Sequence, residues 1–559
     1  MGDIYIGVDV GSASARAIAV DSDGTIYEPA LAELGIHKPR PLYFEQSTDQ
    51  IWDAVLLAVR ELMLKHNISK DRVCALGFDA TCSLAVVGEN GEAIPVSPSP
   101  EWNRHSLFNV MMWMDHRAGS EADLINRSGQ PALASVGGSM SLEMEPPKLL
   151  WLKEQESDRF QQARHFFDLA DYLTYRATGS LSRSLCCLVC KWAYQANNTS
   201  QGWDNNFWKA IGIPEFVDED YSRLGKEVKL PGSLCGSLSV NSAEDLGLNP
   251  GIAVGTGLID AHAGALAMLG CKMPGLESPL SSAAPSEDNQ LSKILVMICG
   301  TSTCHMTFHR DPLSVPGIWG PYFSVIMPGY WTHEAGQSCV GPMLAGLTRQ
   351  YGSGIRGDAP SDPVQCQTWL LTQLKALDSE QGPLAVPRLG QDIHVWPDYH
   401  GNRSPLADPG MKGLVLGLSL ADDEDPLDYL KTLYVAHIQA LALMTRYIVE
   451  KLTEKGYGFE TVYLCGGLQK NWLYVQAHAD VLGLPVVVPE TDECVALGAA
   501  MLGAAASGNF PSLSEAVRAL GPSARLVQPR TELKAFYDKK YDVFRLLEKT
   551  QQEARNIMK

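Results

Sequence analysis

Two aspartates stand near the ends of strand-like segments, where a carboxylate can hold a metal ion or accept a proton. Asp9 lies in GVDVGSASARAIAVDSDG, residues 7–24, which predicts two short strands joined by a tight turn. A carboxylate beside this hydroxyl-rich turn suits a Mg²⁺ ion that keeps its waters and is carried by nucleotide phosphates. Asp9 could equally be a turn residue, because Asp is common in turns. Arg16, on the second strand, could pair with phosphate.

The second aspartate, Asp260, follows the apolar segment GIAVGTGLI, residues 251–259, and precedes a helical run of small residues. Transfer of a phosphoryl group to an alcohol requires a carboxylate near the attacking hydroxyl, because the hydroxyl proton must leave as the new bond forms. Asp260 is placed for that role. A helix N-cap is an alternative of equal weight at a strand-to-helix junction, and His262 is interpreted as a helix-packing residue.

The layout of the first segment recurs after the middle of the chain. Residues 294–311, ILVMICGTSTCHMTFHRD, again predict a strand, a glycine-hydroxyl turn and a second strand. Backbone N–H groups of such turns converge on an anion, and small residues let it come close. The repeat predicts two similar α/β lobes that each offer a hairpin to a shared phosphate-binding cleft. Cys299 stands where the first hairpin has an acid, so the two turns are not equivalent.

A third glycine turn lies in YLCGGLQKNWLYVQAHADVLGLPV, residues 463–486, which predicts a strand, a double glycine and an amphipathic helix. It lacks the GxGxxG pattern, which disfavours a dinucleotide-binding fold. Elsewhere a strand-like segment, 71–80, alternates with helix-like segments at 51–66 and 429–452. This alternation is typical of an α/β architecture. The tail after about residue 511 predicts a charged helical segment.

The length of 559 residues predicts at least two domains, since single hydrophobic cores rarely grow so large. The segment 276–293 is rich in Ser, Pro and acidic residues and has no apolar period, which is typical of a linker or surface insertion. The predicted division is therefore an N-terminal lobe at 1–275 and a C-terminal lobe at 294–559.

Charge and composition exclude several classes of protein. The formal net charge of −19 is spread along the chain, which disfavours binding to nucleic acid or an anionic membrane. No leader-like start and no apolar run of about 18 residues are present, so a soluble, cytoplasmic protein is expected. The CxxC pair Cys187 and Cys190 has no second pair or neighbouring histidine in the sequence. The cysteines are therefore expected to be buried thiols rather than metal ligands.

Many ordered blocks together carry a resemblance to a known family: GVDVGSASAR, GFDATCSL, MMWMDHRA, FFDLADYLTYRATG, LIDAHAG, ICGTSTCHM, EAGQS, HGNRSP, LCGGLQKN and VALGAAMLGA. In this order they resemble the FGGY carbohydrate kinases of the actin-like ATPase superfamily, and within that family the ribulokinases, including the D-ribulokinase branch. The resemblance runs essentially end to end. It implies two actin-like, ribonuclease H-like ATPase lobes around a central cleft, with ATP and Mg²⁺ as cofactors.

The resemblance also implies a role for each matching position. Asp260 resembles the catalytic base, and Asp9 and Asp260 are expected to hold Mg²⁺ through water. Thr301 resembles the γ-phosphate contact, and the nucleotide and phosphate positions are Gly11, Ser12, Arg16, Gly300, Thr301, Ser302, Gly466, Gly467 and Asn471. The sugar positions are Asp79, Thr81, Trp113, Asp115, Lys191 and Glu334. Ser12 departs from the usual Thr of the family, but both side chains carry a hydroxyl.

The activity implied is transfer of the γ-phosphoryl group of ATP to the terminal C5 hydroxyl of D-ribulose, giving D-ribulose 5-phosphate. Two alternatives remain: a kinase for another polyol, namely L-ribulose, xylulose, sedoheptulose or glycerol, or a non-catalytic actin-like ATP-binding scaffold. Retention of Asp9, Asp260, Lys191 and Glu334 argues against the scaffold, which needs neither a sugar site nor a base. The expected partners are a small ketopentose and ATP, with no nucleic acid or membrane, and the chain could form a homodimer.

Overall fold

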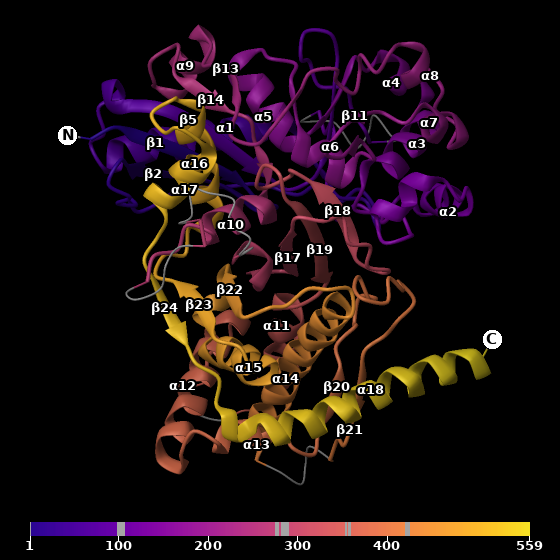
Figure 1. Ribbon diagram of the computed structural model, residues 1–559, viewed down its shortest axis with the longest axis vertical. Coiled ribbons are helices and arrows are strands. Elements are labelled where there is room, and N and C mark those ends of the chain that lie inside the picture. The colour runs from indigo at the N-terminus through magenta and orange to yellow at the C-terminus, as the bar shows by residue number, and fades with distance from the viewer. Residues whose placement is uncertain are drawn as a thin grey trace.

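The computed structural model describes residues 2–97, 107–273, 279–280, 290–352, 355, 359–419 and 425–558. In these ranges the chain folds into two lobes stacked along its long axis, the first coloured indigo to magenta and the second mostly orange to yellow (Figure 1). Each lobe is built on a seven-stranded sheet with helices packed around it. The predicted α/β class is therefore confirmed.

The first sheet begins with the hairpin that carries Asp9. Its strands are β1 (Ile4–Val10), β2 (Ser14–Asp21), β3 (Ala30–Glu33), β5 (Val73–Ala80), β13 (Leu234–Ser237), β14 (Ala253–Gly255) and β15 (Leu258–Ile259). They lie in the order β13-β14-β5-β1-β2-β3, and β15 also pairs with β5. Strand β1 is antiparallel to β2 and parallel to β5. The central strands β1 and β5 are almost wholly buried, as expected for strands covered on both faces.

The second sheet repeats this arrangement. Its strands are β16 (Ile294–Cys299), β17 (Thr303–His309), β18 (Trp319–Phe323), β19 (Trp331–Gln337), β22 (Thr461–Cys465), β23 (Val486–Pro489) and β24 (Ala524–Val527), in the order β18-β19-β17-β16-β22-β23-β24. Strand β16 is antiparallel to β17 and parallel to β22. The series β3-β2-β1-β5-β14 and β19-β17-β16-β22-β23 are equivalent, so the predicted duplication is confirmed.

The long helices agree with their periodic sequences. Helix α14 (Pro426–Thr453) confirms the prediction at 429–452, and α1 (Thr48–Lys65) begins three residues before the predicted start. The early start has a tertiary cause, because the distant Asn109 side chain accepts hydrogen bonds from the backbone N and the hydroxyl of Thr48 at 3.0 Å. Such a cap satisfies a first-turn donor but leaves no local sequence signal.

The remaining α-helices of nine or more residues in the described ranges are α2 (Gly119–Arg127), α3 (Glu145–Gln155), α5 (Leu169–Thr178), α10 (Asp260–Met268), α11 (Gly341–Tyr351), α12 (Pro363–Gln381), α15 (Trp472–Leu482), α16 (Cys494–Ala506) and α18 (Lys534–Ile557). Where the chain is described, none of its helices combines the length and apolar character needed to span a bilayer.

The prediction of a helical segment after about residue 511 was wrong in one respect: β24 separates α17 (Leu513–Leu520) from α18. Strand β24 forms because it completes the second sheet beside β23.

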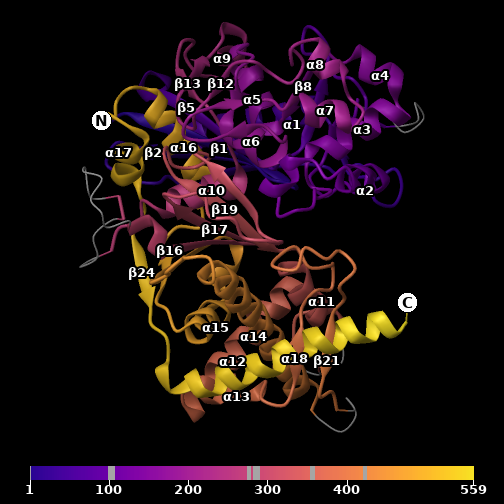
Figure 2. The same cartoon turned by 45° about the vertical axis from the view of Figure 1, so that its right-hand side comes forward.

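Helix α16 comes from the C-terminal half but packs on the N-terminal sheet, and α10 lies beneath it between the lobes (Figure 2). The approach is close: a Cβ on Gly7 or Gly77 would lie 1.9 Å from a carbonyl oxygen of α16.

Of the linker predicted at 276–293, residues 276–278 and 281–289 lie outside the described residues, and Gln290–Lys293 forms a short 3₁₀ helix. The division into 1–275 and 294–559 stays a prediction. Helix α16 belongs to the second range but packs on the sheet of the first.

Candidate active site

A cavity of about 320 Å³ lies where the two hairpin turns approach each other. The predicted site residues that line it are Asp9, Gly11, Ser12, Thr81, Trp113, Lys191, Asp260, Gly300, Thr301, Ser302 and Glu334. They come from both halves of the chain, so the fold brings together residues that the sequence separates by more than 300 positions. A cleft between two turns rich in backbone N–H groups suits an anionic ligand.

Three carboxylates cluster at one end of the cavity, and two of them, Asp9 and Asp260, line it. Asp9 on β1 and Asp79 on β5 are direct neighbours in the parallel register, and Leu258 of β15 pairs with Asp79 just before Asp260. Burial raises the pKa of Asp9 to about 6, although the charge of Arg16 opposes the rise. Burial and the charges of Asp9 and Asp260 raise the pKa of Asp79 well above its usual range. The cluster therefore favours either protons or a cation.

A magnesium ion fits this cluster. Both carboxylate oxygens of Asp79 are buried and receive no hydrogen bond from an N–H or hydroxyl donor among the described residues. The side chain lies within hydrogen-bonding reach of the Asp9 carboxyl, so the two acids can share a proton. The positive charge of Arg16 offsets part of the negative charge of these carboxylates. Arg16 also donates a hydrogen bond to Glu493 at 3.1 Å, so its charge is divided between the two sites. Buried carboxylates of this kind are stable when they are protonated or close to a metal ion. Asp79, predicted as a sugar contact, thus lies beside the proposed metal ligand Asp9 and does not line the cavity.

Asp260 is the first residue of α10, directly after β15. The N-cap alternative was wrong: Ile259 occupies the cap position, and the Asp260 carboxylate accepts a hydrogen bond from the next backbone N, of Ala261, at 2.7 Å. Burial, followed by the charge of Asp9, raises the pKa of Asp260 to about 7. A carboxylate with such a pKa at a cavity wall can accept a proton near neutral pH.

At the other end of the cavity, two ion pairs join the N-terminal and C-terminal halves. Lys191, at the end of α6 (Leu185–Lys191), donates to Glu334 on β19 at 3.2 Å, and Arg403 donates to Glu143 at 2.7 Å. Burial favours the neutral forms of Lys191 and Glu334, but their opposite charges outweigh it. The pKa of Glu334 is consequently lowered and that of Lys191 raised. Both residues are therefore charged at neutral pH.

An indole ring supports these cations, since Lys191 Nζ lies 4.4 Å and Arg403 Cζ 5.4 Å from the ring centroid of Trp319. A second indole links the cavity wall to the first hairpin, because Trp113 Nε1 donates to Ser12 Oγ at 2.9 Å. Thr81 is held through its hydroxyl by Ser83 at 3.1 Å. The polar groups of this wall are thus oriented by the protein itself.

Some predicted residues lie outside the cavity lining, namely Arg16, Asp79, Asp115, Gly466, Gly467 and Asn471. Asp115 is fully buried and accepts from Arg117 Nη2 at 2.6 Å and from the backbone N of Phe44 at 2.7 Å. Asn471 caps α15 by accepting from the backbone N of Tyr474 at 3.1 Å. These contacts hold local structure.

The third glycine turn abuts the second hairpin. Gly466 has a φ of +91°, and a Cβ there would lie 2.5 Å from the carbonyl oxygen of Cys299. Only glycine allows both this backbone conformation and this approach. Gly467 begins the 3₁₀ helix η7 (Gly467–Lys470), which follows directly. The turn thus lies against the end of β16, beside the turn of the second hairpin.

The sequence analysis missed four cavity residues that carry polar groups: Cys82, Glu143, Cys304 and Arg403. Arg403 stands in the HGNRSP block and Cys82 in GFDATCSL, so both had a sequence signal as parts of quoted segments. Cys304 likewise stands in the quoted ICGTSTCHM block. Glu143 had no signal that separates it from an ordinary surface acid, and its position follows only from the tertiary fold.

Comparisons with known proteins match both halves of the chain to one family. Residues 4–267 and 295–507 match the N-terminal and C-terminal domains of the FGGY family of carbohydrate kinases. An FGGY carbohydrate kinase domain-containing protein of Danio rerio is 44% identical over 99% of both chains. A D-ribulokinase of Saccharomyces cerevisiae is 37% identical over 90% of this chain and 72% of its own.

Solved structures bear out the fold. A xylulose kinase from Rhodospirillum rubrum superposes with a TM-score of 0.75 and 20% identity, over 98% of this chain and 99% of its own. At that identity the likeness concerns the fold alone, and it confirms the predicted two-lobed actin-like architecture. The family matches cover most of the chain and both sides of the cavity. The protein belongs to the FGGY family of carbohydrate kinases.

Proposed function

We propose that the protein transfers the γ-phosphoryl group of ATP to the terminal C5 hydroxyl of D-ribulose, yielding ADP and D-ribulose 5-phosphate. The observation that supports this most is one cavity that holds a poised carboxylate, two glycine-hydroxyl turns and a buried Lys–Glu pair. The choice of D-ribulose rests on the similarity to the yeast D-ribulokinase. The lobes are proposed to be 1–275 and 294–559.

The two turns are proposed to bind the phosphates. Gly11 and Ser12 offer backbone N–H and hydroxyl groups from one lobe, and Gly300, Thr301 and Ser302 offer them from the other. Thr301 would contact the γ-phosphate. When bound, a magnesium ion near Asp9, Asp79 and Asp260 supplies positive charge that offsets the phosphate oxygens. Charge stabilisation and positioning provide most of the rate enhancement in phosphoryl transfer.

Asp260 acts as the general base. Its carboxylate accepts the proton of the sugar hydroxyl as the hydroxyl oxygen forms a bond to phosphorus and the bond from phosphorus to the ADP oxygen breaks. The proton then passes to solvent, so the sum is ATP plus ketose giving ADP, sugar phosphate and one proton. Because the pKa of Asp260 is raised to about 7, the base is in its active, ionised form above neutral pH.

The ketose is proposed to lie between Asp260 and the Lys191–Glu334 pair. Lys191 can donate to a sugar oxygen and Glu334 can accept from a hydroxyl, with Glu143 and Arg403 beside them. Buried polar groups left without partners cost about 1–3 kcal/mol each, so a sugar with a misplaced hydroxyl binds less well. Closure of the two lobes on the substrates is expected to exclude water, which would otherwise compete with the sugar and hydrolyse ATP.

The test is ADP release by the purified protein with Mg·ATP, against D-ribulose, L-ribulose, D-xylulose, sedoheptulose, glycerol and no sugar. Strong stimulation by D-ribulose alone is the expected result. Stimulation by a different polyol would retain the kinase activity and overturn the assignment of the sugar. ATP binding without stimulation by any of them would overturn the kinase activity and favour a scaffold.

A further inference from the structure

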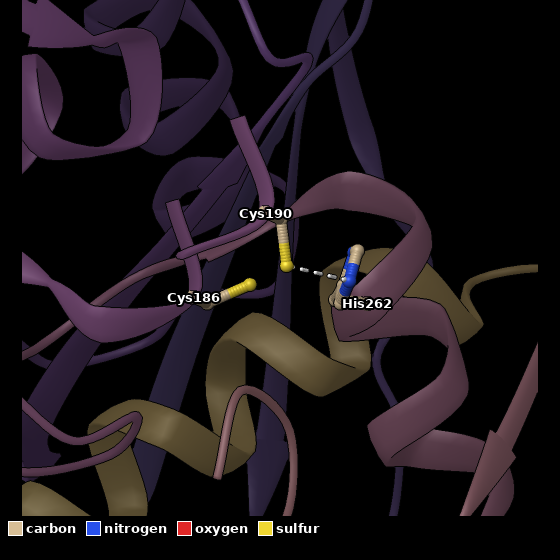
Figure 3. A group of neighbouring side chains, drawn as sticks. All are labelled: Cys186, Cys190 and His262. Carbon is tan, nitrogen blue, oxygen red and sulfur yellow. Dashed lines mark hydrogen bonds between the residues drawn. The ribbon is translucent and has the colours of Figure 1, made fainter. Parts of the chain in front are cut away.

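A group of soft metal ligands lies directly behind the ketose-facing wall of the cavity. Cys186 and Cys190 are on α6, and His262 is on α10; their side chains converge on one another (Figure 3). All three are buried, and the Cys186 Sγ, Cys190 Sγ and imidazole nitrogen atoms lie within 4.8 Å of one another. No histidine stands near these cysteines in the sequence, and the fold brings His262 to Cys190 from 72 positions away.

The spacing of these atoms is compatible with a metal site. Cys190 Sγ lies 3.4 Å from His262 Nε2. Zinc bonds of about 2.3 Å to sulfur and 2.0–2.1 Å to nitrogen place two tetrahedral ligands about 3.5 Å apart. The contact at 3.4 Å shows that Nε2 is the ring nitrogen that faces the Cys190 thiol, while Nδ1 has no hydrogen-bond partner among the described residues. Two thiolates and one imidazole are typical zinc ligands.

A fourth donor stands next to the cluster. Glu334 Oε2 lies 4.0 Å from His262 Nε2, and the same carboxylate is the partner of Lys191. Lys191 directly follows Cys190 on α6. A metal ion at the cluster would therefore compete with Lys191 for Glu334, the pair proposed to bind the ketose.

We propose that Cys186, Cys190 and His262 form a zinc-binding site whose occupancy draws Glu334 away from Lys191 and so weakens ketose binding. Binding of one zinc ion converts two thiols to thiolates and releases two protons to solvent, with no oxidation or reduction. The neutral imidazole contributes a lone pair, and the Glu334 carboxylate completes four ligands. The effect on ketose binding rests on the proposed function, whereas zinc binding itself does not.

The first experiment uses the metal-free, full-length protein titrated with Co²⁺ under anaerobic conditions, because cobalt bound to thiolates gives a strong charge-transfer absorption. One equivalent of Co²⁺ should produce the band, one equivalent of Zn²⁺ should abolish it, and excess Mg²⁺ should not. Absence of a thiolate band in the wild-type protein would overturn the proposal without any variant.

Variants then locate the site. Cys186→Ser, Cys190→Ser and His262→Gln should each lose the band, whereas Cys187→Ser, a matched change on the same helix outside the cluster, should keep it. Thermal unfolding identifies any variant that fails to fold, and the three substitutions on two helices give independent readings. An unchanged band in all of the folded cluster variants would place the bound cobalt elsewhere and overturn the assignment.

The last measurement concerns the link to the ketose. With a ketose that stimulates ADP release, stoichiometric zinc should raise the KM for that sugar about tenfold or more, because a buried charge loses its partner, and should leave the KM for ATP within about twofold. Zinc binding with both KM values unchanged would overturn the link to Glu334. If no sugar stimulates the protein, the cobalt titration still decides the metal site on its own.

Discussion

The two hairpin turns that face the cavity have the same topology but different chemistry. Counted from Gly11 and Gly300, the position of Asp9 corresponds to Ile298, which corrects the sequence-based alignment of Asp9 with Cys299. In the parallel register Asp9 neighbours Asp79, whereas Ile298 neighbours Cys465. The first hairpin therefore carries an acid pair and the second an apolar pair at the same place in the sheet.

This difference indicates that the two copies of the duplicated hairpin are suited to different ligands. The acid pair and Asp260 gather negative charge at one end of the cavity, which suits a metal ion and a proton acceptor. The second turn presents Thr301 and Ser302 without any acid, which suits direct contact with a phosphate. The turns also differ in length, with four residues between the last paired residues in the first and three in the second.

The largest effect is expected from Asp260→Asn, which removes the base at the acidic end while keeping its shape. Turnover should fall about 10²- to 10⁴-fold, the usual contribution of a general base, and ATP binding should be retained. Steady-state kinetics together with equilibrium nucleotide binding measure both. Near-normal turnover in this variant would remove Asp260 from its assigned role.

Asp79→Asn tests whether the acid pair serves a metal ion. The substitution should raise the Mg²⁺ concentration needed for half-maximal rate about 10- to 100-fold, as happens when a group that orients a metal ligand is lost. The matched control is Cys465→Ser, which changes the corresponding position beside the second hairpin. Equal magnesium requirements in the two variants would contradict the proposal that only the first hairpin lies beside a metal site.

Thr301→Val removes one hydroxyl from the second turn at nearly constant volume. A hydrogen bond to a charged group contributes about 1.5 kcal/mol or more, so the kcat/KM for ATP should fall about tenfold. The magnesium requirement should stay as in the wild-type protein. A shift in that requirement as large as the one in Asp79→Asn would mean that both turns serve the metal.

The smallest effect is on stability in the absence of ligands. The pKa values of Asp9 and Asp260 are raised, so the folded state holds these protons more tightly than the unfolded chain does. Their contribution to stability is present below about pH 4 and is lost as the pH rises to about 7. Thermal unfolding should show Tm falling across this range and recovering with Mg²⁺, and Asp260→Asn should fall less steeply. An equal slope in wild-type and variant would contradict the pKa assignment.

Local pattern was enough to predict the hairpins, the α/β class, and the helices α1 and α14, because strand and helix periodicity and glycine turns are properties of short segments. It also placed Asp9 and Asp260 near strand ends. Contacts between distant segments could not be predicted from local pattern, because Glu143 and Arg403 are 260 residues apart and Cys190 and His262 are 72 residues apart. The packing of α16 against Gly7 and Gly77 could not be predicted either, since the local sequence around a glycine does not indicate which distant segment packs against it.

Transfer of the γ-phosphoryl group of ATP to a hydroxyl of the sugar can be followed by phosphorus NMR of the reaction with D-ribulose and Mg·ATP. We expect ADP together with a phosphate ester whose phosphorus couples to the two protons of a terminal CH₂, located at C5 by correlation to carbon. ADP accompanied only by inorganic phosphate, or an ester on a secondary hydroxyl, would contradict it.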